Sequence, residues 1–273
     1  MTDEQQQKLY DFPAGEVLAF DKPLSWTSFN LVSSVRGRLS RRLGVRRLKV
    51  GHAGTLDPLA TGVLIVCTGR ATKEIDRLQA ATKEYVATLR IGCTTPSFDA
   101  EHPIDATYPT DHITRPMVEE TLQQFVGSIW QVPPVYSACK VEGRRAFDYA
   151  REGSDVELKA KELVIDEIEL LSYAMPEITL RVVCSKGTYI RALARDIGQA
   201  LNSGAYLTAL RRTRVGDIRV EDCLPIDAFE RWLDGIRLAP LPEDMERFDW
   251  QQRPERPAGP RKTIVAQAPA SQS

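Results

Sequence analysis

The sequence of 273 residues is poor in the residues that build metal centres and disulfide frameworks. Its five cysteines are scattered and never spaced C-x-x-C, and its three histidines include no pair at positions i and i+4. These absences argue against a disulfide-stabilised secreted domain, a zinc ribbon and a histidine-based metal site. We therefore expect a reduced protein without a metal site.

Long apolar runs and common catalytic motifs are also missing. No uninterrupted apolar run approaches the ~18 residues of a membrane helix. The first residues, MTDEQQQKLYDFP, lack the basic and apolar regions of a secretory signal. No P-loop and no G-x-S-x-G elbow occurs, which argues against a P-loop nucleotide-binding protein and an α/β-hydrolase. We expect a cytoplasmic protein that does not contact membranes.

The charge of the chain is unevenly distributed, although its total is only −1. Residues 22–56 contain no acidic residue, and their basic residues are Lys22, Arg36, Arg38, Arg41, Arg42, Arg46, Arg47 and Lys49. A second basic cluster consists of Arg211, Arg212, Arg214 and Arg219. Clusters rich in arginine favour a phosphate-binding surface, and a solvated helix face is the alternative.

The order of predicted elements indicates an α+β fold. Apolar residues at helical spacing predict one helix after Thr27 and another that Thr188 caps. Strands are predicted over residues 63–67, 84–91, 177–184 and 205–215. Because strands and helices do not alternate strictly, we do not expect a doubly wound sheet.

Three regions are expected along the chain. Residues 1–14 are predicted to be a flexible leader, and residues 15–236 a single folded domain. Residues 237–273 are rich in proline and poor in apolar residues, so they are predicted to form a disordered tail.

The segment GHAGTLDPLATG, residues 51–62, is the most unusual in the chain. Its glycines and proline predict a loop with close backbone approach. Asp57 is the first acidic residue after the basic stretch, and cationic neighbours would lower its pKa and keep it ionised. An ionised, oriented carboxylate can act as a nucleophile. A simple Asp-Pro turn is the alternative, and GHAG also matches the G-x-x-G of KH RNA-binding modules.

The segment CSKGTYIR, residues 184–191, joins a predicted strand to the N-terminus of a helix. Arg191 falls in the first turn, where the helix dipole disfavours a cation. We therefore expect Arg191 to pair with a carboxylate elsewhere in the chain. Tyr85 and Tyr189 have two interpretations, as site residues or as ordinary aromatic residues at the edge of the core.

Taken together, these segments closely resemble the TruB family of bacterial tRNA pseudouridine-55 synthases. The match covers about residues 15–230, in order and spacing. Its segments are Asp21-Lys22-Pro23, Ser25-Trp26-Thr27-Ser28, GHAGTLDPLATGVL (51–64), Lys83-Glu84-Tyr85, Tyr136-Ser137-Ala138-Cys139-Lys140, SKGTYIRALARDIG (185–198) and Leu210-Arg211-Arg212. The resemblance implies the pseudouridine synthase catalytic fold, which is a mixed central sheet with flanking helices and a cleft between two subdomains.

The resemblance also implies roles for individual residues. Asp57 aligns with the catalytic aspartate, Arg191 with its arginine partner, and Tyr85 with the tyrosine that stacks on the uracil and acts on the C5 proton. The implied substrate-binding residues are His52, Tyr189, Leu210, Lys22 and Lys140. Lys140 belongs to an expected insertion at about residues 133–160 for contact with the T loop, in which Arg144 and Arg145 could also meet phosphates.

The implied reaction is isomerisation of the uridine at position 55 of tRNA, after base flipping, by cleavage of the N1–C1′ bond and rejoining through C5. No electrons are exchanged, so no cofactor is expected. Whether Asp57 attacks C6, attacks C1′ or assists elimination to a glycal is left open.

The implied partner is the T stem-loop of tRNA, bound by a monomer without guide RNA. The Pro-rich end of the chain is not expected to form a complete PUA domain. A non-catalytic RNA-binding protein or tRNA chaperone is the alternative, and within the enzyme class ribosomal or guide-directed RNA is the alternative substrate.

Overall fold

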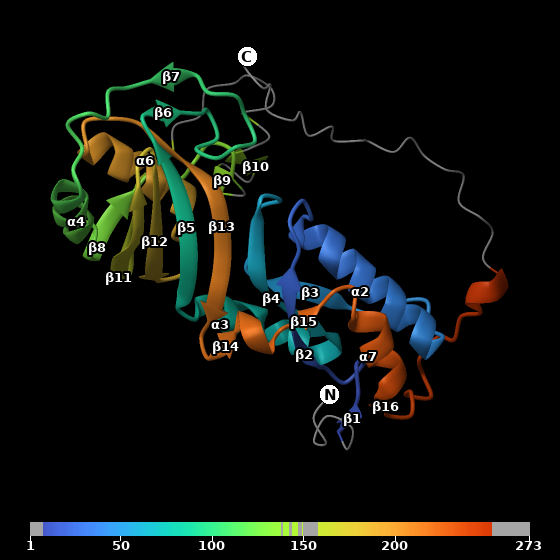
Figure 1. Cartoon of the computed structure of the whole chain (residues 1–273). Helices are drawn as coiled ribbons and strands as arrows, with labels where there is room; N and C mark the ends of the chain where they lie inside the picture. The colour runs from blue at the N-terminus through green and yellow to red at the C-terminus, as the bar shows by residue number, and fades with distance from the viewer. Residues whose placement is uncertain (1–7, 138, 142–143, 147–148, 150–157, 253–273) are drawn as a thin grey trace, which may run out of the picture.

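The computed structural model describes residues 8–137, 139–141, 144–146, 149 and 158–252. Within these residues, the main sheet has the order β15-β2-β4-β13-β5-β12-β11-β8, with β3 beside β4 and β14 beside β13 (Figure 1). Its strands are β2 (Val17–Lys22), β3 (Val50–Ala53), β4 (Ala60–Thr68), β5 (Lys83–Ile91), β8 (Gly127–Gln131), β11 (Lys161–Ala174), β12 (Glu177–Cys184), β13 (Ala205–Val215), β14 (Ile218–Arg219) and β15 (Leu224–Pro225). The pairing is mixed, which confirms the expected α+β class.

Different helices cover the two halves of this sheet (Figure 1). The helices α2 (Ser28–Leu43) and α7 (Phe229–Gly235) accompany β2, β3 and β4, whereas α4 (Arg115–Gln123) and α6 (Ile190–Ala200) accompany β5, β11 and β13. The turn η1 (Gly69–Glu74) and the helix α3 (Ile75–Ala80) follow β4. The halves join where β4 and β13 run parallel over three residue pairs, Ala60–Gly62 with Leu210–Arg212.

Each half has its own apolar core, built from periodicities visible in the sequence. Helix α2 begins after Thr27, whose side chain accepts the N–H of Asn30, and it buries Leu31, Val35 and Leu39. Helix α6 has its apolar residues in the order predicted, including Leu193 and Ile197. The two halves of the sheet are therefore packed against separate apolar cores.

The expected leader and tail are wrong where the structure describes them. Strand β1 (Leu9–Tyr10) pairs in parallel with β16 (Arg237–Leu238), and Phe12 is fully buried. Near the other end, the η3 turn (Trp250–Gln252) places the Trp250 indole N–H against the carbonyl of Ser40 in α2. A few aromatic residues supply enough apolar contact to hold both segments, and average composition concealed them. Residues 1–7 and 253–273 lie outside the described residues.

Other predicted boundaries also moved. The expected loop at residues 51–62 is shorter, because Gly51–Ala53 belong to β3 and Ala60–Gly62 begin β4. Segment 94–109, for which the sequence shows no regular pattern, contains β7 (Ala106–Thr107), paired with β6 (Cys93–Thr94). The expected insertion at 133–160 is described only in part, including a hairpin of β9 (Lys140–Val141) and β10 (Arg144–Arg145). No helix in the described ranges is long and apolar enough to cross a membrane.

Candidate active site

A pocket of about 290 Å³ opens where the two halves of the sheet meet. Residues from both halves line it, including Asp57, Tyr85, Tyr189, Arg191, Leu210 and Arg212. The structure therefore brings together six residues that the sequence singled out, five as site residues and Arg212 as part of the second basic cluster, from segments separated by as many as about 150 positions.

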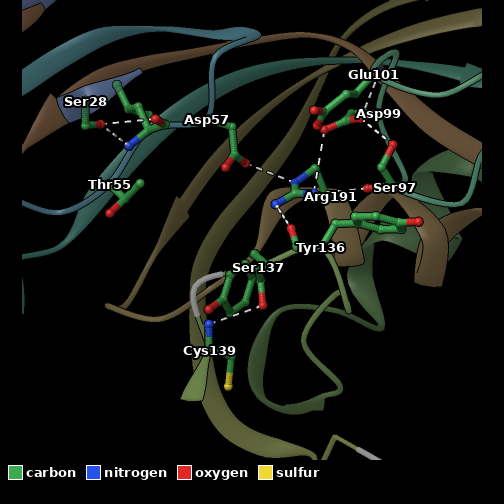
Figure 2. A network of polar contacts seen from close by, with 12 residues as sticks. Ser28, Thr55, Asp57, Ser97, Asp99, Glu101, Tyr136, Ser137, Cys139 and Arg191 are labelled. Atoms are coloured by element: carbon green, nitrogen blue, oxygen red, sulfur yellow. Dashed lines mark hydrogen bonds and ion pairs between the residues drawn. The ribbon is translucent and has the colours of Figure 1, made fainter. Parts of the chain in front are cut away.

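The expected ion pair between Asp57 and Arg191 is confirmed. Oδ2 of Asp57 lies 3.0 Å from Nε of Arg191, and the two side chains point toward each other across the site (Figure 2). The Arg191 side chain is only 6% exposed, whereas that of Asp57 is 41% exposed. The buried Arg191 guanidinium thus orients Asp57, and one side of the Asp57 carboxylate remains accessible to a substrate.

The remaining nitrogens of Arg191 are held by a group of acceptors that we call the arginine cradle, namely Ser97, Asp99 and Tyr136. Nη1 donates to the carbonyl of Ser97 at 3.2 Å and lies 3.6 Å from Oδ2 of Asp99. Nη2 donates to the carbonyl of Tyr136 at 2.8 Å (Figure 2). With every nitrogen engaged, the planar fork has one orientation, and Nε faces Asp57.

Asp99 is a residue that sequence reasoning missed. It is buried, and its Oδ1 accepts hydrogen bonds from the Ser97 hydroxyl at 2.6 Å and from the backbone N–H of Glu101 at 3.0 Å. Segment 94–109 shows neither helical nor strand periodicity, so the sequence offered no signal for a buried carboxylate there. Asp99 shares Arg191 with Asp57, which adds a second negative charge behind the site.

The backbone of residues 54–58, called the aspartate loop below, is tied down on both sides of Asp57. The Ser28 hydroxyl accepts the N–H of Leu56 at 2.8 Å and donates to the carbonyl of Leu56 at 3.1 Å. The N–H of Ser25 donates to the carbonyl of Pro58 at 2.8 Å. These bonds flank Asp57 and fix the direction of its carboxylate.

Lys22 and Arg212 have roles other than those expected. Lys22 was predicted to bind substrate, but it is fully buried and its ammonium donates to the carbonyls of Pro23, Trp26 and Pro58. Burial lowers its pKa to about 8, against the attraction of Asp57. Arg212, predicted to contact phosphates, is 2% exposed and donates to the carbonyls of Gly54 and Val63. Both cations stabilise the aspartate loop from behind.

Gly62 shows how tightly this support is packed. Its φ angle is +104°, and a Cβ at this position would collide with the backbone of Arg212. The glycine is therefore required for the short contact between β4 and β13 at the seam.

The pKa of Asp57 differs from the prediction. Burial raises it above the ordinary value of 3.8, and the charge of Asp99 adds to this effect. Arg191 and Lys22 act in the opposite direction but do not outweigh burial. The largest cause is that the surrounding protein removes water from the carboxylate, which disfavours its charged form.

The tyrosines form aromatic walls of the pocket. Tyr85 lies on β5 and is 8% exposed; burial raises the pKa of its hydroxyl, and the charge of Arg212 opposes the shift. Tyr189 immediately precedes α6, and burial raises its pKa as well. Both side chains therefore present neutral hydroxyls. Thr188 does not cap α6 as predicted, because its hydroxyl donates to the carbonyl of Ser185.

The other expected substrate-binding residues are placed unevenly. Leu210 lines the pocket at the seam. His52 lies on β3 outside the pocket lining, and burial together with the charge of Arg212 lowers its pKa. The backbone of Lys140 belongs to β9, and the side chains of Lys140, Arg144 and Arg145 lie outside what the structure describes.

Most arginines of the two basic clusters are engaged in ion pairs or buried. The second is not one phosphate surface, because Arg211 pairs with Asp21 at 2.8 Å, Arg214 lies 3.6 Å from Glu84, and Arg212 is buried. In the first, Arg38, Arg42 and Arg46 lie 3.6–3.9 Å from acidic residues of the C-terminal segment. Arg41, Arg47 and Lys49 are exposed and have no ion-pair partner among the described residues.

Among the residues that the structure describes, no group of three histidine, cysteine or carboxylate side chains could hold a metal ion. The five cysteines are free and buried. The chemistry that the pocket offers is that of a carboxylate, a guanidinium and aromatic hydroxyls.

Comparison with known proteins covers most of the chain. The model of the TruB family pseudouridylate synthase N-terminal domain matches residues 41–190, and the model of the tRNA pseudouridylate synthase B C-terminal domain matches residues 191–235. Proteins named tRNA pseudouridine synthase B are 69% identical in Phocaeicola vulgatus, 67% in Bacteroides thetaiotaomicron and 50% in Flavobacterium johnsoniae. Each alignment covers 82% of this chain and 95%, 95% and 98% of those proteins, respectively.

A solved structure supports the same fold. A chain in the crystal structure of a Cbf5-Nop10-Gar1 complex aligns with a TM-score of 0.61 and 29% identity. The alignment covers 83% of this chain but 58% of that chain, so this chain spans less than two thirds of its length.

Proposed function

The chain belongs to the TruB family of pseudouridylate synthases, and on that premise we propose that it isomerises the uridine at position 55 of tRNA to pseudouridine. The observation that carries the proposal is the oriented pair of Asp57 and Arg191, placed beside Tyr85 in one pocket. A carboxylate held by a buried guanidinium and left open on one face is suited to attack or to electrostatic assistance.

The pocket supports recognition of a base that has left its stack. Its volume of about 290 Å³ admits a pyrimidine nucleotide, and Tyr85, Tyr189 and Leu210 provide aromatic and apolar walls. Flipping a base costs a few kcal/mol, and stacking on one aromatic side chain contributes ~1–3 kcal/mol. The walls can therefore offset the cost of flipping.

The proposed chemistry conserves atoms and electrons. Asp57, oriented by Arg191, promotes cleavage of the N1–C1′ bond by attack at C6, by attack at C1′ or by assisting elimination to a glycal. The uracil then turns, C5 bonds to C1′, the proton on C5 leaves, and N1 gains a proton. The net reaction is an isomerisation without a redox change.

Tyr85 is proposed to stack on the uracil and to handle the C5 proton. Because burial raises the pKa of its hydroxyl, a phenolate is disfavoured. We therefore assign the neutral hydroxyl a relay role, in which it accepts the C5 proton while its own proton passes to solvent, and N1 takes one proton from solvent in exchange.

Contacts outside the pocket are proposed to come from the first basic cluster and the insertion. Arg41, Arg47 and Lys49 are exposed and suited to phosphate contacts, which position RNA without reading its sequence. A monomer that acts on the T stem-loop in the cytoplasm, without guide RNA, completes the proposal.

The test uses a tRNA transcript that carries uridine or cytidine at position 55. Purified protein should convert only the uridine transcript, and mass-spectrometric mapping should place the pseudouridine at position 55. The same mapping of tRNA from a strain that lacks this protein should show an unmodified position 55. Pseudouridine at another position would contradict the assignment of position 55. Binding of tRNA without any pseudouridine would favour the tRNA chaperone.

A further inference from the structure

Gln131 is a buried polar side chain at the end of β8 that the reaction scheme above does not use. It is 1% exposed, and it lies opposite Lys161 of β11 in the sheet. Its Oε1 accepts the backbone N–H of Tyr189 at 2.9 Å, across 58 positions of sequence. This bond ends at the residue from which the N-terminal turn of α6 begins.

That N–H has no alternative partner within its own segment. Tyr189 occupies the N-cap position of α6 and makes no side-chain capping bond, and the Thr188 hydroxyl is directed to the carbonyl of Ser185. The first N–H groups of a helix have no intrahelical acceptor. Gln131 therefore supplies from another strand the acceptor that the N3 Glu or Gln of a capping box would give to the N–H of the N-cap residue, and N3 here is Ala192.

The chain that follows Gln131 stays in contact with α6. The carbonyl of Val132 accepts from Nη2 of Arg195 at 3.1 Å, and the carbonyl of Tyr136 accepts from Nη2 of Arg191 at 2.8 Å. Segment 131–136 is thus attached to the start of α6 at three points. Gln131 is the side-chain contact among them, so it can be changed by substitution without altering the backbone acceptors.

We propose that Gln131 is a positioning residue that sets the Tyr189–Arg191 turn, and through it the aromatic wall of the pocket and the guanidinium that orients Asp57. The inference rests on the proposed function for its kinetic readout. Loss of the acceptor leaves the Tyr189 N–H buried and unpaired, so the turn shifts to find another partner. A shift near 1 Å at a catalytic group can cost ~100-fold in rate.

The test compares Gln131→Met, which removes the acceptor at similar length, with Gln131→Glu, which keeps an acceptor at a helix N-terminus that favours negative charge. Single-turnover formation of pseudouridine at saturating enzyme should fall ~10- to 100-fold in Q131M, with RNA affinity nearly unchanged, and Q131E should restore most of the rate. If Q131M does not fold, Gln131→Asn withdraws the carbonyl by one methylene and takes its place.

Ser203→Ala is the matched control. Its hydroxyl donates to the carbonyl of Pro109 near the other end of α6, so the variant loses a buried hydrogen bond without touching the Tyr189 turn. S203A should lower the unfolding temperature and leave the single-turnover rate unchanged. A wild-type rate in Q131M, equal losses in Q131M and Q131E, or an equal loss in S203A would overturn the proposal.

Hydrogen exchange separates this inference from the proposed function. The Tyr189 amide should exchange faster in Q131M than in wild type, and Q131E should restore its protection, whether or not pseudouridine forms. Unchanged exchange in Q131M would overturn the inference, whereas a wild-type protein that makes no pseudouridine would overturn only the proposed function.

Discussion

The two sides of the pocket are held by different kinds of contact. The aspartate loop is supported from behind by Lys22, Arg212 and Ser28, all of which bond to its backbone or to the backbone beside it. Arg191 is instead held through its own side chain by the arginine cradle, which comes from irregular segments. The Asp57 carboxylate is oriented by hydrogen bonds that fix its backbone. The Arg191 guanidinium is oriented because acceptors bind its N–H groups.

This difference predicts unequal sensitivity. Substitutions on the aspartate side should either abolish turnover or leave it unchanged, because the Asp57 carboxylate is the single group there that acts on the substrate. Changes on the arginine side should reduce the rate in steps, because several acceptors share the same guanidinium. The predictions below test this contrast, from the largest effect to the smallest.

Asp57→Asn keeps the shape of the side chain and removes its charge. Turnover should fall by about 10³-fold or more, while tRNA binding survives, because the reacting carboxylate is lost and the aromatic walls stay. Single-turnover assays and filter binding measure the two effects. Asp21→Asn, which breaks the pair with Arg211 outside the pocket, is the control and should turn over normally. Substantial pseudouridine formation by D57N would show that the Asp57 carboxylate is not the reacting group.

Tyr85→Phe retains the ring and removes the hydroxyl. Proton transfer by a positioned side chain contributes about 10²–10⁴-fold, so this variant should bind tRNA normally and complete the reaction at least about 10²-fold more slowly. Tyr85→Leu should lose both stacking and turnover. Equal rates for Phe and Tyr at this position would remove the proton relay from the scheme but leave stacking in place.

Arg191→Lys keeps the charge and loses the planar fork. The turnover rate should fall by about 30-fold, more than tRNA affinity, because one ammonium cannot satisfy both the cradle and Asp57. Arg191→Met should also lower the free energy of unfolding by roughly 3–5 kcal/mol, since it leaves the buried Asp99 without a cationic partner. The control is Arg181→Lys, because Arg181 contacts three carboxylates but lies on β12 outside the pocket lining. A similar loss of rate in both lysine variants would contradict a specific role for the fork.

Asp99→Asn tests the pH dependence. Since the pKa of Asp57 is raised and the ionised form is required, the rate should fall with decreasing pH at values above those of an ordinary aspartate. Asp99 contributes to that raised pKa, so D99N should move the acid limb to lower pH and lower the plateau by about tenfold. An acid limb that stays in place, measured from pH 4 to 9, would show that Asp99 does not act on Asp57 electrostatically.

Arg41→Gln should have the smallest effect. Arg41 is exposed and lies outside the pocket, so its loss should raise the Kd for tRNA a few-fold and leave the single-turnover rate unchanged. One lost phosphate contact should reduce the slope of log K against log salt by about 0.7–0.9. Arg38→Gln, whose partner is Glu230, is the comparison and should change the slope less. Equal slopes for R41Q and wild type would show that Arg41 of α2 does not contact RNA phosphates.

The sequence by itself determined the elements and the pairing at the centre. Helical periodicity predicted α2 and α6, and alternation predicted β5. A cation in the first turn of α6 predicted that Arg191 needs a carboxylate. These inferences succeeded because the information is local: spacing decides which face is apolar, and the helix dipole acts within a turn.

Only the tertiary structure decided which charged residues face the substrate. Lys22 and Arg212 read as surface cations, yet both are buried under the aspartate loop; Asp99 and Gln131 gave no signal and now hold Arg191 and Tyr189. The direction of the pKa shift of Asp57 also differs from the prediction, because desolvation, together with the charge of Asp99, outweighs Arg191 and Lys22. Burial and hydrogen-bond partners depend on contacts between segments far apart in the chain, and periodicity carries no record of those contacts.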